Sequence, residues 1–410
     1  MSFQGLGLGP DLLKAVAEEG YEDPTPVQSL AIPLVLSGTD LLARAQTGTG
    51  KTAAFALPIL ELLKSKANTS FSPARHPVRA LIVTPTRELA VQIHDSFRDY
   101  GRHVPLRKSV VYGGVPMGPQ EKALRDGVEI LVATPGRLLD HANSRSVDLR
   151  QVEILVLDEA DRMLDMGFID DIRKIIGLLP PKRQNLLFSA TFSADIRRLA
   201  GTILTDPKTV DVEPAVTSAE MVEQVVYLVD DTKRRELLAH LVKSRDLKQV
   251  LVFTRTKLMA GRLASWLDRN GIEAMAIHGD RSQPERERAL AAFRAGEVRI
   301  LVATDVAARG LDIEALPQVI NFELPMHAQD YIHRIGRTGR AGAPGRAISL
   351  VSLQDEEDLK AINRLLKRDL PVRVVRGFEP IGGVATPESR SRRPRSTTSR
   401  SRSQGTVAAR

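Results

Sequence analysis

The sequence predicts an α/β protein of two similar domains, each with a parallel sheet flanked by helices. Three observations predict this class. Short apolar runs alternate with helical segments, these runs are almost continuously hydrophobic, and two of them recur at a fixed spacing. Continuous hydrophobicity is expected of parallel strands that helices cover on both faces. The length of 410 residues also exceeds one ordinary core and predicts two or three domains.

The predicted strands fall into two series. The first series covers 41–43, 80–83, 130–133, 154–157 and 185–188, and the second covers 225–229, 250–253, 274–277, 300–303, 319–322 and 347–350. The peptide at 130–134 reappears letter for letter at 300–304, an offset of 170, and 81–86 resembles 251–256 at the same offset. Two matches at one offset predict a duplicated domain.

Composition predicts where the duplicated domains begin and end. The segment 213–221 has the composition of a linker, so we expect domains at 1–212 and 222–375. The tail at 376–410 is rich in Ser, Thr and Arg, has almost nothing to bury and is expected to be disordered. It holds eight Arg and two Glu, a charge of +6, so the remaining body carries only +2 of the total of +8. This balance indicates a nearly neutral enzyme with a basic tail.

Several classes of protein are excluded or disfavoured by composition. The chain has no cysteine, which excludes disulfides, thiolate zinc sites and a cysteine nucleophile. No run approaches the roughly eighteen apolar residues that span a bilayer, so we expect no membrane association. The first residues lack the features of a signal peptide. We therefore expect a cytoplasmic protein.

A glycine-rich segment, AQTGTGKT at 45–52, follows a predicted strand and precedes the apolar-patterned helix 53–63. This setting predicts a phosphate-binding loop, because backbone N–H groups and a helix N-terminus together attract phosphate. Lys51 is expected to reach the β- and γ-phosphates and Thr52 to coordinate Mg²⁺. The strict pattern has Gly where Ala45 stands, but the later glycines are present; a purely structural turn is the weaker interpretation. The predicted nucleotide contacts here are Ala45, Gln46, Thr47, Gly48, Thr49, Gly50, Lys51 and Thr52.

The second half has no counterpart of this loop, which predicts that it completes a nucleotide site between the domains. In the first half the strand 154–157 runs into Asp158, Glu159, Ala160 and Asp161. Carboxylates at this end of a parallel strand face the ligand crevice. We expect Asp158 to hold Mg²⁺ and Glu159 to orient and deprotonate the attacking water. Helix capping alone is the alternative, and it is less consistent with the neighbouring phosphate loop.

Residues 158–161 spell D-E-A-D, and in this setting the chain resembles the DEAD-box RNA helicases, whose motifs recur in order over residues 20–340. The resemblance implies two tandem RecA-like domains and an ATP-dependent RNA helicase that uses ATP and Mg²⁺. Residues 20–28 resemble the adenine-reading segment, in which Gln28 would contact the edge of the base and Tyr21 would stack on it. Phe3 is either a second aromatic contact or part of the core.

The resemblance also assigns the remaining motifs. Arg337 and Arg340, three residues apart and flanked by glycines, are implied to reach one γ-phosphate from the other lobe, a role worth roughly 10³–10⁵ in rate. Asp312 would contact the ribose. The implied coupling residues are Asp161, Ser189, Thr191 and His333. The implied RNA contacts are Pro85, Thr86, Arg87, Gly114, Thr134, Pro135, Gly136, Arg137, Gly279, Gln283, Arg286 and Thr304.

Aromatic residues make up only 4% of the chain, which favours gripping of the RNA backbone, single-stranded or in a short duplex, with little sequence preference. The choice of RNA over DNA comes from the resemblance, with 2′-hydroxyl contacts as its physical basis. The expected activity is local duplex unwinding or RNP remodelling by a monomer, with ribosomal or RNA-decay proteins among the partners. The basic tail is either solubilising or, as we favour, a salt-sensitive tether to RNA phosphates. An ATP-gated RNA clamp, a DNA translocase and a metabolic ATPase are the alternatives.

Overall fold

The computed structural model describes residues 2–45, 48–212, 222–308, 316–339 and 345–381. They form two seven-stranded sheets in which every pairing is parallel. The first sheet contains β1 (Leu41–Arg44), β2 (Ala80–Val83), β3 (Lys108–Val111), β4 (Ile130–Ala133), β5 (Ile154–Leu157), β6 (Gln184–Ser189) and β7 (Lys208–Asp211). The second contains β8 (Val222–Leu228), β9 (Val250–Thr254), β10 (Ala274–Ile277), β11 (Ile300–Thr304), β12 (Gln318–Asn321), β13 (Gly345–Val351) and β14 (Val372–Val374).

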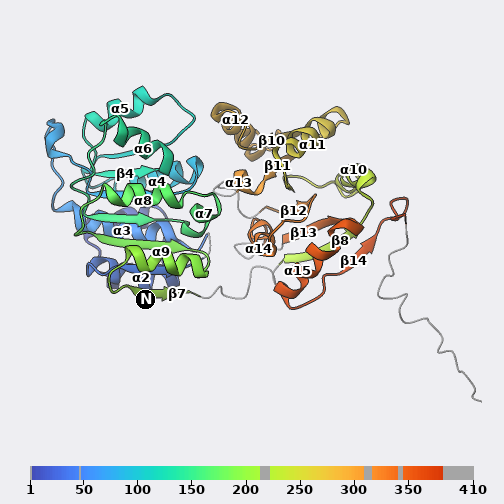
Figure 1. Ribbon diagram of the computed structural model, residues 1–410, viewed down its shortest axis with the longest axis horizontal. Helices are drawn as coiled ribbons and strands as arrows, with labels where there is room; N and C mark the ends of the chain where they lie inside the picture. Colours follow the sequence, from blue (N-terminus) through green and yellow to red (C-terminus); the bar gives the residue numbers. More distant parts are fainter. Residues whose placement is uncertain (1, 46–47, 213–221, 309–315, 340–344, 382–410) are drawn as a thin grey trace, which may run out of the picture.

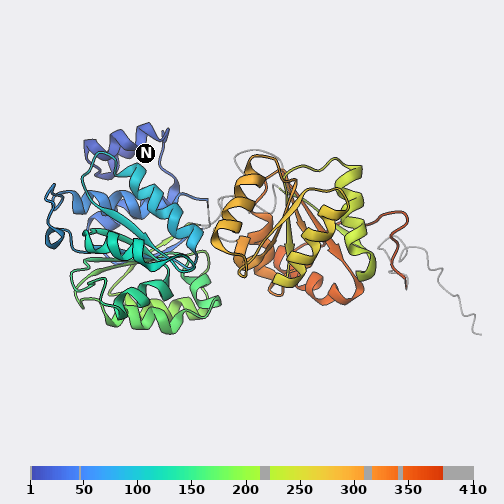
Figure 2. The same cartoon turned by 90° about the horizontal axis from the view of Figure 1, so that it is seen from above.

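The two sheets have the same topology. Their strand orders are β3-β4-β2-β5-β6-β1-β7 and β10-β11-β9-β12-β13-β8-β14, so each strand of the second sheet occupies the place of the strand seven earlier. The repeated peptides form β4 and β11, and their similar partners form β2 and β9, at equivalent positions. The predicted duplication is therefore confirmed. We call the described residues up to 212 the first lobe and those from 222 the second lobe; they lie side by side in Figures 1 and 2.

Helices cover both faces of each sheet. The first lobe contains α1 (Pro10–Glu18), α2 (Pro26–Leu36), α3 (Lys51–Lys64), α4 (Arg87–Tyr100), α5 (Met117–Arg125), α6 (Pro135–Asn143), α7 (Ala160–Asp165), α8 (Ile169–Gly177) and α9 (Ala194–Ile203). The second contains α10 (Arg234–Ser244), α11 (Lys257–Arg269), α12 (Gln283–Arg294), α13 (Asp305–Ala308), α14 (Ala328–Ile335) and α15 (Glu356–Leu366). Short 3-10 helices lie at Phe3–Leu6, Pro73–Arg75, Asp231–Lys233 and Leu353–Asp355.

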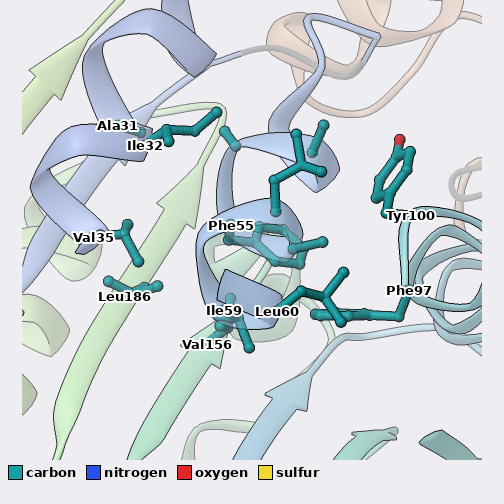
Figure 3. Packing of buried hydrophobic residues seen from close by; sticks show 14 of the residues in the cluster. Ala31, Ile32, Val35, Phe55, Ile59, Leu60, Phe97, Tyr100, Val156 and Leu186 are labelled. Atoms are coloured by element: carbon teal, nitrogen blue, oxygen red, sulfur yellow. The ribbon is translucent and has the colours of Figure 1, made fainter. Parts of the chain in front are cut away.

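Each sheet divides its core into two layers, because successive strand side chains point to opposite faces. Ala80 and Ile82 pack with α1 to α4, whereas Leu81 and Val83 pack with α5 to α9. Figure 3 shows Phe55 of α3 among side chains of α2, α4 and the sheet, and all of these are buried. Helix α3, which begins at the glycine-rich segment, is therefore packed closely against the sheet. In the second lobe α10 and α11 cover one face and α12 to α15 the other.

Three strands were not expected from the sequence: β3, β7 and β14. All three are edge strands, and most of their residues are only partly buried or exposed. These three edge strands are not covered like central ones and lack the continuous apolar run by which the other strands, the edge strand β10 included, were recognised. Phe3 lies in the core of the first lobe, as the packing alternative predicted. Residues 213–221 and most of the tail lie outside the described residues.

None of the helices in the described part of the chain combines the length and the apolar character needed to cross a membrane.

Candidate active site

The phosphate-loop segment connects a central strand to a buried helix. Strand β1 leads through buried Ala45 to Gly48 and Gly50, whose φ angles of 79° and 88° lie in the left-handed region that favours glycine. Helix α3 begins at the next residue, Lys51. The Lys51 ammonium is buried and has no hydrogen-bond partner within the described part of the chain. A buried cation at a helix N-terminus is a fitting partner for a phosphate group. Gln46 and Thr47 lie outside the described residues.

Gln28 links the segment before α2 to this loop. Its side-chain oxygen accepts a hydrogen bond from the Thr25 N–H (2.9 Å), and its Nε2 donates to the Gly50 carbonyl (3.1 Å). The amide keeps a further hydrogen and lone pair for a ligand. Tyr21 is 39% exposed, and its hydroxyl lies 3.1 Å from that of Tyr100. Gln28 is thus hydrogen-bonded directly to the predicted phosphate loop. Its contact with adenine stays a prediction.

These residues line a cavity of about 630 Å³, a volume typical of small-ligand sites. Its walls come from the segment 20–28, the phosphate loop, α4 and the end of β5, and they include Thr52, Asp158 and Glu159. Arg337, which follows α14, also lines it. The cavity is therefore completed by the second lobe.

The two adjacent carboxylates at the end of β5 have different environments. Burial raises the pKa of Asp158 to about 6, although Lys51 opposes the shift. Burial would also raise the pKa of Glu159, but Arg162, Lys51 and Arg337 outweigh it and hold the value below the ordinary one. Glu159 is therefore ionised at neutral pH, as a general base must be. It also has a φ of 52°, a strained conformation for a residue other than glycine.

The oxygen atoms in the cavity suit a magnesium ion. Thr52 and Asp158 both line it, and hydroxyl and carboxylate oxygens are ligands that Mg²⁺ accepts. Among the described residues no group of three or more His, Cys, Asp and Glu side chains is placed to hold a metal. Mg²⁺ commonly uses one or two protein oxygens with water and substrate phosphates, so this donor set fits it.

A second cavity, of about 660 Å³, adjoins the first. It shares Lys51, Glu159 and Arg337 with the first and adds the predicted coupling residues Asp161, Thr191 and His333.

Asp161 lies at the centre of the predicted coupling residues. Its Oδ2 accepts hydrogen bonds from the N–H groups of Ala190 and Thr191 (both 3.1 Å) and from the Thr191 hydroxyl (3.2 Å). The buried Ser189 hydroxyl accepts a bond of 3.3 Å from the Thr191 N–H. The structure therefore brings Asp161, Ser189 and Thr191 together and places His333 on the wall of the same cavity.

The predicted RNA residues lie at the carboxyl ends of neighbouring strands. In the first lobe they follow β2, β3 and β4, which are adjacent in the sheet. In the second lobe Gly279 follows β10, Thr304 ends the adjacent β11, and Gln283 and Arg286 lie in α12. Those of the first lobe are Pro85, Thr86, Arg87, Gly114, Thr134, Pro135, Gly136 and Arg137. Parallel strands end at one edge of a sheet, so the structure gathers these motifs in each lobe.

Two of these arginines differ in their partners. Arg137 donates to the Val115 carbonyl (3.0 Å), while its Nη1 is buried without a hydrogen-bond partner among the described residues. Arg286 Nη2 lies 2.6 Å from Glu88 Oε1, on the other lobe. Glu88 Oε1 and Arg286 Nε have no hydrogen-bond partner among the described residues, so we describe this contact as an ion pair. A guanidinium with uncommitted donors suits an RNA phosphate.

Two residues of this region were missed by sequence reasoning. Glu88 pairs with Arg286 between the lobes, and no local pattern reveals such a contact. Arg162 donates to Glu159 three residues earlier (2.8 Å) and to the Val306 carbonyl of the second lobe (2.8 Å). The sequence indicates the pair only through the opposite charges of Glu159 and Arg162, which are three residues apart at the start of a helix. Asp312 and Arg340 lie outside the described residues.

Comparisons with known proteins agree with the geometry. The family model described as DEAD/DEAH box helicase matches residues 25–199, and that of the helicase conserved C-terminal domain matches 232–342. The DEAD-box ATP-dependent RNA helicase RhpA of Helicobacter pylori is 42% identical over 369 residues, which are 90% of this chain and 73% of the relative. CshA of Bacillus subtilis, described in the same way, is 41% identical over 370 residues, with the same two shares.

A solved structure of similar fold is Saccharomyces cerevisiae Dbp5 bound to RNA and ADP BeF3. It is 32% identical, and the match covers 91% of this chain and 95% of that chain with a TM-score of 0.79. The family models span most of both lobes and the curated relatives span nine tenths of the chain. This chain therefore belongs to the DEAD-box family of ATP-dependent RNA helicases.

Proposed function

We propose that the cavity between the lobes binds ATP with Mg²⁺ and that its hydrolysis drives local unwinding of short RNA duplexes through the residues described above. One observation carries this proposal: Arg337 of the second lobe lines both cavities together with Lys51 and Glu159 of the first. The triphosphate end of a nucleotide on Lys51 would therefore meet a cation from the opposite lobe.

Each group at this junction has a distinct part in the chemistry. Lys51 and the loop N–H groups bind the phosphates, and Glu159 orients the attacking water and takes its proton. Arg337, with Arg340, stabilises the charge that develops on the transferred phosphoryl group. Thr52 and Asp158 would hold Mg²⁺, which when bound supplies neutralisation of phosphate charge. Tyr21, Gln28 and Asp312 bind the nucleoside end.

The RNA path follows the strand ends of both lobes. We assign the RNA backbone to the motif residues after β2, β3 and β4 and to those at β10, β11 and α12. Because ATP and RNA each contact both lobes, binding of one offsets part of the ordering cost of the other. Loss of the γ-phosphate releases Arg337 and lets the lobes part, a change that Asp161, Ser189, Thr191 and His333 transmit to the bound strand.

The domain division belongs to the same proposal. We assign residues 1–212 to an ATP-binding domain, 213–221 to a linker and 222–375 to a second helicase domain. The basic segment 376–410 acts as a salt-sensitive tether to RNA phosphates. We further propose a cytoplasmic monomer that acts on RNA with little sequence preference, including RNA in complexes with ribosomal or RNA-decay proteins.

The experiment measures steady-state ATP turnover without nucleic acid, with single-stranded RNA and with DNA of matched sequence, alongside strand displacement on a short RNA duplex. RNA is expected to stimulate turnover far more than DNA, and the duplex is expected to separate. Equal stimulation by DNA would indicate a DNA translocase, and turnover without strand displacement an RNA clamp. A chain that neither polymer stimulates would be a metabolic ATPase.

Two substitutions test the assigned residues in the same assay. Glu159→Gln is expected to lower turnover by roughly 10²–10⁴ while ATP-dependent RNA binding survives. Lys51→Ala is expected to weaken nucleotide binding and turnover. Glu121→Gln, on α5 and outside both cavities, is the matched control and should behave as the wild type. Unchanged turnover in either active-site variant would contradict the role assigned to that residue.

A further inference from the structure

Arg162 connects the catalytic carboxylate to the opposite lobe. It lies in α7 and is only 4% exposed. Its Nη1 donates to Glu159 Oε2 and its Nη2 donates to the Val306 carbonyl, each over 2.8 Å. Val306 belongs to α13 of the second lobe, and Figure 1 shows α7 and α13 on the facing sides of the two lobes. One guanidinium therefore joins the two lobes beside the reacting centre.

The shape of the guanidinium makes these two contacts interdependent. It is a planar fork with donors in fixed directions, so its orientation is set when both ends are engaged. The side chains of Arg162 and Glu159 are 5% and 10% exposed, and a charge-assisted hydrogen bond in such surroundings is strongly directional. When the lobes separate, Nη2 loses the Val306 carbonyl and water reaches the pair. The orientation of the Glu159 carboxylate then becomes less restricted.

Helix α13 is also fixed to the segment that carries the arginine finger. Arg334 donates two parallel hydrogen bonds to the Asp305 carboxylate, of 2.6 and 2.7 Å, and it is almost completely buried. Asp305 immediately precedes Val306, and Arg334 precedes Arg337 by three residues. The Val306 carbonyl and the Arg337 side chain therefore arrive at the first lobe together.

We infer that Arg162 is a positioning residue that holds the Glu159 carboxylate in its working orientation only when the two lobes are closed. This inference rests on the proposed role of Glu159 as the base. It adds a second consequence of closure to the arrival of the arginine finger: the first lobe carries the base, but the second lobe completes its alignment. An open complex with ATP bound is thereby protected against unproductive hydrolysis.

The test compares turnover with lobe closure in the full-length protein. Because the chain has no cysteine, Lys122→Cys on α5 and Asp268→Cys on α11, both exposed, provide two unique labelling sites for a distance measurement by fluorescence. Closure is measured with RNA and ADP–BeF3, and ATP turnover is measured at saturating RNA. The variants are Arg162→Gln and Arg162→Lys, with Arg173→Gln on the exposed face of α8 as the control.

Arg162→Gln is expected to reach the closed state at saturating ligand and yet to have a kcat lowered by about 10- to 100-fold, the scale of a small misplacement of a catalytic group. The KM for ATP should change far less. Arg162→Lys keeps the charge but not the fork, so kcat should recover only in part; this variant carries the test if the glutamine variant does not fold. Arg173→Gln should behave as the wild type.

A double substitution separates positioning from simple stabilisation. If Arg162 acts through Glu159, Glu159→Gln with Arg162→Gln should lose no more turnover than Glu159→Gln alone. Independent losses that multiply would overturn the inference, as would a kcat that falls only in proportion to the closed fraction. Full activity of Glu159→Gln by itself would instead refute the proposed base. An inactive Glu159→Gln beside a fully active Arg162→Gln would refute only the inference.

Discussion

Asp161 and Thr191 are joined by two hydrogen bonds, because Oδ2 of the carboxylate accepts both the backbone N–H (3.1 Å) and the hydroxyl (3.2 Å) of Thr191. The other carboxylate oxygen, Oδ1, accepts a hydrogen bond of 3.0 Å from the backbone N–H of Arg162. The carboxyl end of β5 is therefore connected to the segment after β6 through a single side chain.

Asp161→Asn should uncouple unwinding from hydrolysis. Both oxygens of Asp161 accept hydrogen bonds, whereas an asparagine side chain has one oxygen acceptor and one NH₂ donor. In either orientation the NH₂ group would therefore face an N–H donor of the protein. A lost hydrogen bond to a charged group is worth about 1.5–3 kcal/mol. We expect strand displacement per ATP hydrolysed to fall by about tenfold or more. The control is Asp170→Asn, on the exposed start of α8. Equal proportional losses of turnover and displacement would contradict the coupling role.

Gly114→Ala should weaken the response to RNA. The residue has a φ of +81°, and a Cβ there would lie 2.1 Å from Arg87 Nη1. Alanine would therefore displace Arg87 and add about 1–2 kcal/mol of backbone strain. We expect the RNA concentration for half-maximal stimulation to rise by about tenfold, with the KM for ATP little changed. At Gly113 a Cβ would meet only Arg87 Nη2, at 3.9 Å, so Gly113→Ala is the matched control. Identical behaviour of the two variants would count against Arg87 as an RNA contact.

Gln28→Glu should impair ATP binding. Its Nε2 now donates to the Gly50 carbonyl at 3.1 Å, and a carboxylate oxygen in that place would face another acceptor. We expect the KM for ATP to rise by about tenfold, while binding of RNA without nucleotide stays unchanged. Gln4→Glu makes the same chemical change at an exposed position. An unaltered KM in Gln28→Glu would show that this contact does not shape the nucleotide site.

The sequence predicted the central strands and the local motifs, because their information is contained in contiguous residues. The strand–loop–helix around Lys51 and the acidic residues after β5 lie where they were expected. The edge strands β3, β7 and β14 were not predicted, because their partly exposed residues do not form a continuous apolar run. The sequence also did not predict the contacts of Arg162 with Val306 and of Glu88 with Arg286. They depend on how the lobes pack, which no contiguous pattern encodes.

Protonation of Asp355 should make the second lobe less stable in acid. Burial alone would raise the pKa of this carboxyl, but hydrogen bonds from Ser352 and the cation Arg234 lower it below the ordinary value. A depressed carboxyl pKa stabilises the fold above the unfolded value of about 4, and this stabilisation is lost as the pH falls through the folded value.

Thermal unfolding between pH 7 and pH 3 measures this contribution. Asp355→Asn should destabilise the protein by about 3 kcal/mol at pH 7, because Arg234 loses its buried partner. The difference from the wild type should shrink as the pH falls below about 4. Asp268→Asn, at an exposed position, should show neither effect. A difference independent of pH would contradict the assignment.

The arrival of Arg337 at the γ-phosphate is tested most directly by the affinity of Arg337→Ala for ADP and for ADP–BeF3 in the presence of RNA. Arg337 lines the cavity that Lys51 enters from the other lobe. The substitution should therefore leave ADP binding nearly unchanged, weaken ADP–BeF3 binding by at least tenfold, and lower hydrolysis by roughly 10³–10⁵. Arg346→Ala, at an exposed pair on β13, is the control. If Arg337→Ala binds ADP–BeF3 as tightly as the wild type and hydrolyses ATP at the same rate, the site is not built by two lobes.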